Sequence, residues 1–228
     1  MKNYSLSNRL MSAASYVRPG SAIADIGTDH AWLPIYLIDR GIARRAVAAD
    51  INEGPLDRAR INIPKGMKAK IELRLTDGLR GIENCGVDDI LICGMGGELI
   101  ARIIKDAPFT KSEKTRLVLQ PMTKAAFLRE FLLSEGFSII GETLSDDDRI
   151  YQTLCAEFVG KRDRYSPLEL LLGRHNIEKG GELFLRFVEQ NIKTFTAVKE
   201  GKASAQTPDT SYEDEILKGL LEIREKAL

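Results

Sequence analysis

Three carboxylates stand at the ends of apolar runs that have the length of a β-strand. They are Asp25, Asp50 and Asp77. In a parallel sheet the carboxyl ends of neighbouring strands meet at one edge, so these side chains are expected to face the same ligand. Carboxylates accept hydrogen bonds from ribose hydroxyls and from amino groups. The pattern therefore predicts a site for a nucleoside-shaped ligand at the edge of an α/β sheet.

The two later carboxylates also have a purely structural interpretation. Asp50 could accept hydrogen bonds from both ribose hydroxyls, or it could begin the turn over 51–55, where Asp and Asn are common. Asp77 could accept a hydrogen bond from an adenine amino group, or Asp77-Gly78 could be only a turn. We favour the ligand in both cases because each residue follows a predicted strand.

A glycine-rich run follows the fourth predicted strand. Residues 94–97 read Gly-Met-Gly-Gly and come directly after Cys93. Glycine lets a ligand or a target base approach the backbone closely, although a tight turn from strand to helix is the alternative. The next predicted strand leads into 120–122, where the Gln120 amide could hydrogen-bond the edge of a base.

The hydropathy pattern predicts the framework that positions these groups. Apolar runs of strand length alternate with amphipathic helical stretches, which is typical of a parallel sheet with helices on both faces. Ser5 is the expected N-cap of the first helix. The predicted strands span 22–26, 45–49, 71–75, 90–93 and 117–119, and the predicted helices span 6–17, 31–40, 55–63, 98–105 and 124–135.

The alternation ends with two strand-like runs, 137–143 and 150–158, joined by a polar turn that leaves no room for a crossover helix. These runs should pair as an antiparallel hairpin. A parallel sheet that ends in such a hairpin is typical of class I methyltransferases, which use S-adenosylmethionine. Dinucleotide-binding domains instead need glycine at positions 29 and 32, where this chain has Asp29 and Trp32. The fold is therefore predicted to be a Rossmann-like methyltransferase sheet.

Beyond residue 160 the pattern changes to long helices. We predict a Rossmann-like domain over 1–160 and a helical extension over 161–228. Apolar residues recur at helical spacing over 183–195 and again over 216–221, and 201–211 is predicted to be a polar loop between two helices. Two such helices should fold back as an antiparallel coiled-coil hairpin.

Composition narrows the partners and the compartment. The 228 residues include 33 Lys and Arg and 33 Asp and Glu, so any contact with nucleic acid must come from a local patch. Cys85, Cys93 and Cys155 are odd in number and widely spaced, which supports neither a disulfide framework nor a zinc site. No run approaches the roughly 18 apolar residues of a membrane span. A soluble, cytoplasmic protein without metal is expected.

Five segments follow one another in order along the chain. They are Leu6-Ser7-Asn8-Arg9-Leu10, Ala24-Asp25-Ile26-Gly27-Thr28-Asp29-His30-Ala31-Trp32-Leu33-Pro34, Gly54-Pro55-Leu56, Cys93-Gly94-Met95-Gly96-Gly97 and Leu119-Gln120-Pro121. In these segments the chain resembles the TrmK family, the bacterial tRNA (adenine-N1)-methyltransferases that act at adenine 22. The resemblance runs from Leu6 to about Phe158. It implies a Rossmann-like domain with a C-terminal coiled-coil extension, S-adenosylmethionine as the methyl donor, and tRNA as the substrate.

Methylation at N1 of adenine needs positioning more than proton removal, because the in-plane lone pair is free at neutral pH. A carboxylate close to the base would stabilise the positive charge that develops on it. Asp29, with His30 beside it, is the candidate, although Asp29 could instead cap the helix over 31–40 and His30 could be an ordinary turn residue. Residues 94–97 stand where amino-group methyltransferases have an Asp/Asn-Pro-Pro-aromatic motif, which disfavours methylation at N6.

The expected contacts form three sets. The catalytic set is Asp29, His30 and Gln120. The cofactor-binding set is Asp25, Gly27, Asp50, Ile51, Asn52, Asp77, Gly78, Cys93 and Gly94. The substrate-binding set is Arg9, Met95, Gly96, Gly97, Pro121 and Met122.

Two other functions stay open at this point. One is a methyltransferase that acts on another RNA base or on a small molecule, which the balanced charge favours. The other is a non-catalytic RNA-binding protein that has kept the fold. The intact acidic strand ends argue against the second, because a scaffold has no use for them.

Overall fold

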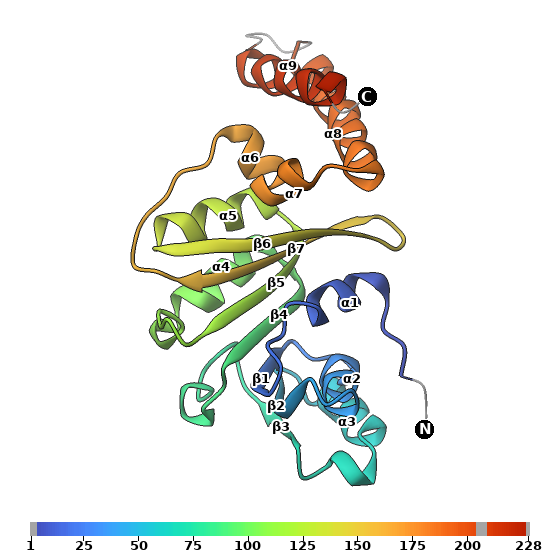
Figure 1. Cartoon of the computed structure of the whole chain (residues 1–228), viewed down its shortest axis with the longest axis vertical. Coiled ribbons are helices and arrows are strands. Elements are labelled where there is room, and N and C mark those ends of the chain that lie inside the picture. The colour runs from blue at the N-terminus through green and yellow to red at the C-terminus, as the bar shows by residue number, and fades with distance from the viewer. Residues whose placement is uncertain (1–3, 204–208, 227–228) are drawn as a thin grey trace. The chain divides into compact units, whose positions relative to one another are not determined.

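The computed structural model describes residues 4–203 and 209–226 (Figure 1). The chain divides into two compact units, and the boundary in the sequence lies between Arg164 and Tyr165. The first unit holds a seven-stranded sheet with five α-helices. Its strands are β1 (Ser21–Ile26), β2 (Ala43–Asp50), β3 (Ile71–Leu75), β4 (Asp89–Gly96), β5 (Arg116–Thr123), β6 (Phe137–Asp146) and β7 (Ile150–Phe158). Its helices are α1 (Asn8–Ala14), α2 (Trp32–Asp39), α3 (Glu53–Asn62), α4 (Gly97–Lys105) and α5 (Ala125–Ser134).

The sheet has the strand order β3-β2-β1-β4-β5-β7-β6. The first five strands of the chain pair in parallel, whereas β7 pairs antiparallel with both β5 and β6. This confirms the predicted class I methyltransferase sheet with its terminal hairpin. The strand order reverses between β1 and β4, and in open α/β sheets ligands bind outside the carboxyl ends of the strands at such a point.

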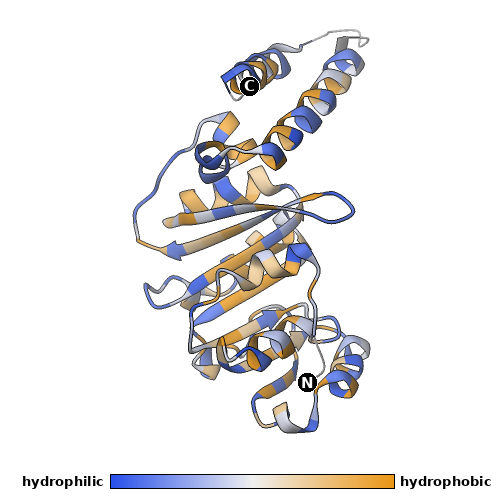
Figure 2. Ribbon diagram, turned by 45° about the vertical axis from the view of Figure 1, so that its right-hand side comes forward, coloured by the Kyte–Doolittle hydropathy of each residue, from blue (hydrophilic) through white to orange (hydrophobic). Residues whose placement is uncertain are grey.

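Helices cover both faces of the sheet (Figure 1). The helices α1, α2 and α3 lie on one face, where their side chains form a single buried cluster with Ile23, Leu91 and Val118 of the central strands. The helices α4 and α5 pack on the other face and against each other. Hydrophobic residues run along the central strands between these layers (Figure 2). Strands covered on both faces must be apolar throughout, which is why short apolar runs predicted them well.

Two central strands are longer than predicted. The sequence pattern ended β4 at residue 93 and β5 at residue 119, but β4 continues to Gly96 and β5 to Thr123. The register between them shifts on both sides of Met95, which is aligned with Pro121. Proline has no N–H to donate, so a strand tolerates it where the ladder is irregular. Glycine and proline are rare inside strands, so the sequence pattern ended both strands too early. These strand ends carry most of the predicted substrate contacts.

The first helix is shorter than predicted. It spans only Asn8–Ala14, and its N-cap position is occupied by Ser7 rather than by Ser5. The Ser7 side chain makes no capping hydrogen bond. The first backbone N–H groups of α1 are instead bound by Asp147, which lies in the loop between β6 and β7. Its start is therefore set by a tertiary contact that local sequence does not reveal.

The second unit is helical, with α6 (Pro167–Leu172), α7 (Arg174–Lys179), α8 (Glu182–Ala203) and α9 (Ser211–Lys226). Three ion pairs join α8 to α9, and they run in opposite sequence order, from Glu189–Arg224 through Lys199–Asp214 to Lys202–Glu213. The two helices are therefore antiparallel. The predicted loop over 201–211 begins too early because α8 continues to Ala203, and residues 204–208 lie outside the described part. The domain limits at 160 and 161 stay a prediction.

No helix in the described ranges 4–203 and 209–226 is both long enough and apolar enough to cross a membrane.

A buried ion pair ties α5 to the terminal hairpin. The Arg129 Nε donates to the Glu142 carboxylate over 2.6 Å, and a second guanidinium nitrogen donates to the Gln152 side chain over 2.7 Å. The side chains of Arg129 and Glu142 are both fully buried. A buried charge is stable only while it is paired, so this contact fixes the position of α5 against β6 and β7.

We expect Arg129→Met to lower the free energy of unfolding by about 3–5 kcal/mol, because it leaves the Glu142 carboxylate buried without its cation. Lys111→Ala is the control, since it breaks the more exposed Lys111–Glu135 pair and should cost less than about 1 kcal/mol. Chemical denaturation measures both. Adding Glu142→Gln to Arg129→Met should recover part of the loss, and equal losses in the two single variants would contradict this account.

Candidate functional site

A cavity of about 260 Å³ opens at the point where the strand order reverses. It is framed by the carboxyl ends of β1 and β4, by the turn after β1, and by the first turns of α1 and α2. The lining residues are Arg9, Leu10, Asp25, Gly27, Asp29, Trp32, Leu33, Cys93 and Gly94. Six of the predicted site residues therefore line one cavity, together with three that were not predicted.

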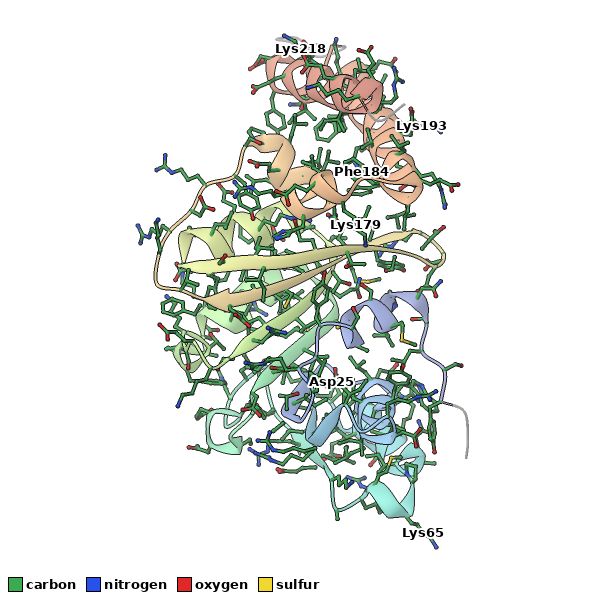
Figure 3. The ribbon with its side chains drawn as sticks, in the orientation of Figure 1. Asp25, Lys65, Lys179, Phe184, Lys193 and Lys218 are labelled. Atoms are coloured by element: carbon green, nitrogen blue, oxygen red, sulfur yellow. The ribbon has the colours of Figure 1, made fainter. Side chains whose placement is uncertain are left out.

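The Asp25 carboxylate is the most deeply buried charged group of this cavity (Figure 3). It shares a face of β1 with Ile23, so it points to the side that α1, α2 and α3 cover. Burial raises the pKa of Asp25 to about 6, and the neighbouring charge of Asp50 adds to this effect. A hydrogen bond of 2.6 Å from the Thr28 hydroxyl acts in the opposite direction. The site thus holds a carboxylate that would gain from a cationic partner.

The turn after β1 keeps the backbone close to β2 and β4. Gly27 has a φ of +75°, and a Cβ there would lie 2.1 Å from the Met95 Cε. The N–H groups of Gly27 and Thr28 both donate to the Ala49 carbonyl, at 2.8 and 2.9 Å. The end of the Met95 side chain can shift, so the positive φ is what favours glycine at position 27.

The tip of β2 carries a second carboxylate with an exposed apolar neighbour. Asp50 Oδ1 accepts a hydrogen bond of 2.8 Å from the backbone N–H of Asn52. Asp50 therefore begins a turn, and it lies close enough to Asp25 to raise the pKa of that residue. Its contact with ribose hydroxyls stays a prediction. Ile51 is 61% exposed, which leaves a flat apolar surface beside the carboxylate.

Asp29 belongs to a small polar cluster at the mouth of the cavity. Arg58 of α3 donates to its Oδ1 over 2.9 Å, and the His30 Nε2 lies 3.5 Å from the same oxygen. Asn62 Nδ2 contacts the His30 Nδ1 at 3.3 Å and its carbonyl at 3.2 Å. If Nδ1 accepts from Asn62, the ring proton is on Nε2 and faces Asp29. The side chains of Arg58 and Asn62 thus orient both predicted catalytic residues of this turn.

Asp29 does not cap α2, so that alternative is wrong. The N-cap position is Ala31, whose φ is +55°, and its side chain makes no capping hydrogen bond. His30 also has a positive φ, of +64°. Two consecutive left-handed residues other than glycine displace the helix start, and such backbone strain is common where a turn is shaped for binding.

A second cluster joins α1 to the ends of β5 and β7. The Arg9 Nη1 donates to the Gln120 Oε1 over 3.2 Å, and its guanidinium lies 5.8 Å from the centre of the Tyr151 ring. The Gln120 Nε2 faces only the Met122 sulfur, at 3.9 Å, among its described partners. Gln120 is fully buried, and a thioether is a weak acceptor, so its amide is held mainly by Arg9. Its contact with a base stays a prediction.

The glycine-rich run at the end of β4 and the start of α4 serves two different purposes. Gly94 has a φ of +82° and lines the cavity, 3.7 Å from the Arg9 guanidinium when a Cβ is placed on it. A Cβ on Gly97 would lie 2.4 Å from the Lys124 carbonyl oxygen, and one on Gly96 would lie 3.3 Å from the Thr123 hydroxyl. Gly96 and Gly97 are therefore explained by the close approach of the junction between β4 and α4 to the end of β5 and to Lys124.

Asp77 and Gly78 lie outside the cavity that Asp25 lines. They border a separate cavity of about 310 Å³ against α4, and the Asp77 carboxylate is 4.0 Å from Arg80. Gly78 has a φ of +60°, and a Cβ there would lie 3.2 Å from Ile103. The structure thus gives Gly78 a packing role, and the cofactor contacts of both residues stay predictions.

Comparison with known proteins shows which family the chain belongs to. Residues 6–154 match the family model described as a methyltransferase domain. The chain is 35% identical over 227 residues to the tRNA (adenine(22)-N(1))-methyltransferase of Bacillus subtilis strain 168, a match that covers 96% of this chain and 94% of the relative. The chain belongs to the tRNA (adenine(22)-N1)-methyltransferase family. The resemblance to this family in the sequence motifs is therefore confirmed.

Solved structures agree with this family assignment. The crystal structure of the B. subtilis M1A22 tRNA methyltransferase TrmK aligns with a TM-score of 0.82 at 33% identity, and covers 98% of this chain and 97% of its own. TrmK of M. capricolum, solved with the cofactor product S-adenosyl-homocysteine, aligns with a TM-score of 0.74 at 28% identity and 97% coverage of both chains. A Streptococcus pneumoniae protein solved with S-adenosyl-L-methionine aligns at 0.85 and 29% identity, covering 96% of this chain and 100% of its own.

Several residues of this methyltransferase site were not predicted. Trp32 lines the cavity and is 41% exposed, and its ring stacks on His30 with 6.1 Å between the centroids. Arg58, Asn62 and Tyr151 reach the site from α3 and β7. In the sequence, Trp32 was noted only because it stands where a dinucleotide-binding motif has glycine. The other three residues lie in ordinary helix and strand patterns, which give no indication of a site.

The described residues contain no group of three or more His, Cys, Asp or Glu side chains arranged to hold a metal ion. Cys85, Cys93 and Cys155 are free thiols, and burial raises the pKa of Cys93 above its usual range.

We expect Asp25→Asn to stabilise the protein without ligand and to weaken its binding of S-adenosylmethionine. The pKa of Asp25 is raised from 3.8 to about 6, so the ionised form costs stability, by about 3 kcal/mol at neutral pH. The folded state binds the proton more tightly, so wild-type stability should fall as pH rises between about 4 and 6. Thermal denaturation between these pH values should show that the melting temperature of the variant changes less with pH than that of the wild type.

Asp39→Asn, at the exposed end of α2, is the matched control and should change neither property. Calorimetry measures the affinity of each variant for S-adenosylmethionine. An Asp25→Asn variant that binds the cofactor as tightly as the wild type would remove Asp25 from the binding site.

Proposed function

We propose that this protein transfers a methyl group from S-adenosylmethionine to N1 of adenine 22 in tRNA. The observation that carries the proposal is the buried carboxylate of Asp25 in the cavity at the strand-order reversal, in a chain of this family. A tRNA substrate also places the reaction in the cytoplasm. The other functions that the sequence left open have no feature of the site in their favour.

The cavity offers groups that suit each part of S-adenosylmethionine. When bound, this cofactor supplies a methyl group on a positively charged sulfur. The Asp25 carboxylate suits a cationic partner, and its raised pKa reflects how much it would gain from one. The Asp50 carboxylate suits ribose hydroxyls, and the exposed Ile51 side chain beside it suits the face of a purine. Gly27 and Gly94 both line the cavity, so a ligand bound there would lie against their backbone.

Asp29 is the residue that we assign to the target base. N1 of adenine has a free lone pair, so no residue has to remove a proton before the methyl transfer. Positive charge develops on the base during the reaction, and a fixed carboxylate stabilises that charge. The Arg58 and His30 side chains hold the Asp29 carboxylate in one orientation at the cavity mouth. Asp29 would also accept a hydrogen bond from the adenine amino group.

The remaining walls suit an unpaired base. N1 lies on the Watson-Crick edge, so the adenine must leave its helix before it reaches the site. Trp32 offers an exposed aromatic face next to Asp29. The Gln120 amide, whose Nε2 has only a thioether acceptor among the described residues, suits the edge of a base. The apolar Met95, Pro121 and Met122 suit its faces. Arg9 lines the cavity and could approach a phosphate or the base.

The first experiment maps the methylated position. The purified protein is incubated with labelled S-adenosylmethionine and an unmodified tRNA transcript that carries A22, beside an otherwise identical A22G transcript. We expect N1-methyladenosine in the A22 transcript only, as identified by nucleoside mass spectrometry. Activity should also fall steeply as the salt concentration rises, because tRNA binding depends on phosphate contacts.

Each other outcome points to a different function. Methylation of both transcripts would move the target to another position of the tRNA. No methylation of either transcript, with cofactor binding intact, would overturn the proposal in favour of a different substrate or a non-catalytic role. Activity that is insensitive to salt would favour a small molecule.

Asp29→Ala should lower the single-turnover rate of methylation by roughly 10- to 100-fold, because the developing charge on the adenine loses its fixed carboxylate. Binding of tRNA should change little, because one exposed carboxylate contributes little to a contact with phosphates. Asp39→Ala removes an exposed carboxylate of α2 and serves as the control. A normal single-turnover rate in Asp29→Ala would end the catalytic assignment of this residue.

A further inference from the structure

The loop between β6 and β7 carries three consecutive aspartates, 146–148, close to the first helix. Negative charge close to bound RNA would repel its phosphates. We therefore asked whether these aspartates make contacts within the protein instead. Two of them make such contacts. The Asp147 carboxylate binds α1, and the Asp148 carboxylate accepts a hydrogen bond of 2.7 Å from the Tyr151 hydroxyl.

Asp147 holds the start of α1 with both of its carboxylate oxygens. The backbone N–H of Asn8 donates to Oδ1 over 3.0 Å, and the backbone N–H of Arg9 donates to Oδ2 over 2.9 Å. The Asn8 side chain donates to the Asp146 carbonyl over 2.7 Å. Ser7 at the N-cap makes no side-chain hydrogen bond, so Asp147 replaces the usual local cap with a partner from 138 residues along the chain.

The same hairpin holds the other end of Arg9. The Arg9 guanidinium lies over the ring of Tyr151 in β7, and Tyr151 is fixed by its hydrogen bond to Asp148. From there the guanidinium reaches Gln120, and it lines the cavity next to Gly94. The backbone and the side chain of Arg9 are thus both positioned by residues of the β6–β7 hairpin.

The rest of the contact between α1 and this hairpin contains unpaired polar groups. Buried hydroxyls of Ser12 in α1, Ser145 in β6 and Thr153 in β7 have no hydrogen-bond partner among the described residues. Gly141 of β6 is required by Tyr16, since a Cβ there would lie 2.7 Å from the Tyr16 ring. The Tyr16 hydroxyl, just after α1, is hydrogen-bonded to the Thr143 hydroxyl of β6 over 2.7 Å, so the end of α1 is held as well. Asp147 is the contact that holds its first turn, where Arg9 lies.

We propose that Asp147 is a positioning residue for methyl transfer, which acts by placing Arg9 at the wall of the cavity. This rests on the proposed function, in which Arg9 faces the substrate. Asp147 itself lies in an exposed loop and does not line the cavity, so its effect on the reaction passes through α1. A seven-residue helix that is fixed at its first turn carries Arg9 and Leu10 into the site as one unit.

A double-mutant cycle between Asp147 and Arg9 tests the proposal. Asp147→Ala should lower kcat/KM for tRNA, at saturating S-adenosylmethionine, by about tenfold, because a small misplacement of a contacting group is costly. In an Arg9→Ala background the same substitution should change kcat/KM by less than about twofold. Asp147→Asn keeps one acceptor oxygen and should recover part of the activity. Asp39→Ala controls for the loss of an exposed negative charge.

The cycle separates positioning from a general loss of stability. If the reductions from Asp147→Ala and Arg9→Ala multiply in the double variant, Asp147 acts independently of Arg9 and the proposal is overturned. Unchanged activity in Asp147→Ala overturns it as well. Thermal denaturation accompanies each variant, and if Asp147→Ala does not fold, the cycle is run with Asp147→Asn. The product map of the wild-type enzyme reports separately on the proposed function, because the cycle can follow whichever methylated product forms.

Discussion

A carboxylate buried at the end of β1 is the interaction on which the arrangement of this site depends. Asp25 cannot be moved to solvent without breaking the strand, because Ile23 and Ile26 on either side of it are core residues. The cavity in front of it lies where the strand order reverses next to β4. The Thr28 hydroxyl and the turn at Gly27 partly compensate the charge, and the pKa of about 6 shows that compensation is incomplete. The remaining electrostatic cost favours a ligand that brings positive charge.

The terminal hairpin connects this charged site to the edge of the sheet. β7 completes the sheet by pairing antiparallel with β5, and the loop before it reaches over to α1. The helix α1 covers the same face of the sheet as Asp25 and supplies one wall of the cavity. On the opposite face, the buried pair of Arg129 with Glu142 anchors the hairpin to α5. The β6–β7 hairpin, which is typical of this fold class, therefore also fixes the position of α1 at the wall of the cavity.

How much the sequence predicts depends on how far apart the interacting residues are. The strand centres and the hairpin follow from local hydropathy, because strands buried on both faces are continuously apolar. The strand tips at Asp25 and Asp50 follow from the same pattern, since a tip is where the apolar run stops. The length of α1 does not follow, because its start is bound by a residue 139 positions away. Arg58 and Tyr151 were missed for the same reason, as each reaches the site through a long-range contact.

The glycine-rich run over 94–97 shows why a motif does not act as a single functional unit. From sequence, its three glycines had two interpretations, close approach of a ligand and a tight turn. Packing accounts for Gly97, whereas the ligand contact of Gly94 stays a prediction. Gly94 lines the cavity with a left-handed backbone, whereas Gly97 admits the carbonyl of Lys124, a residue that is itself left-handed with a φ of +57°. The close approach at Gly97 joins the start of α4 to Lys124 after β5, so Gln120 and Met122 keep their place relative to Gly94. A glycine with no ligand contact can thus be as necessary to the site as one that lines it.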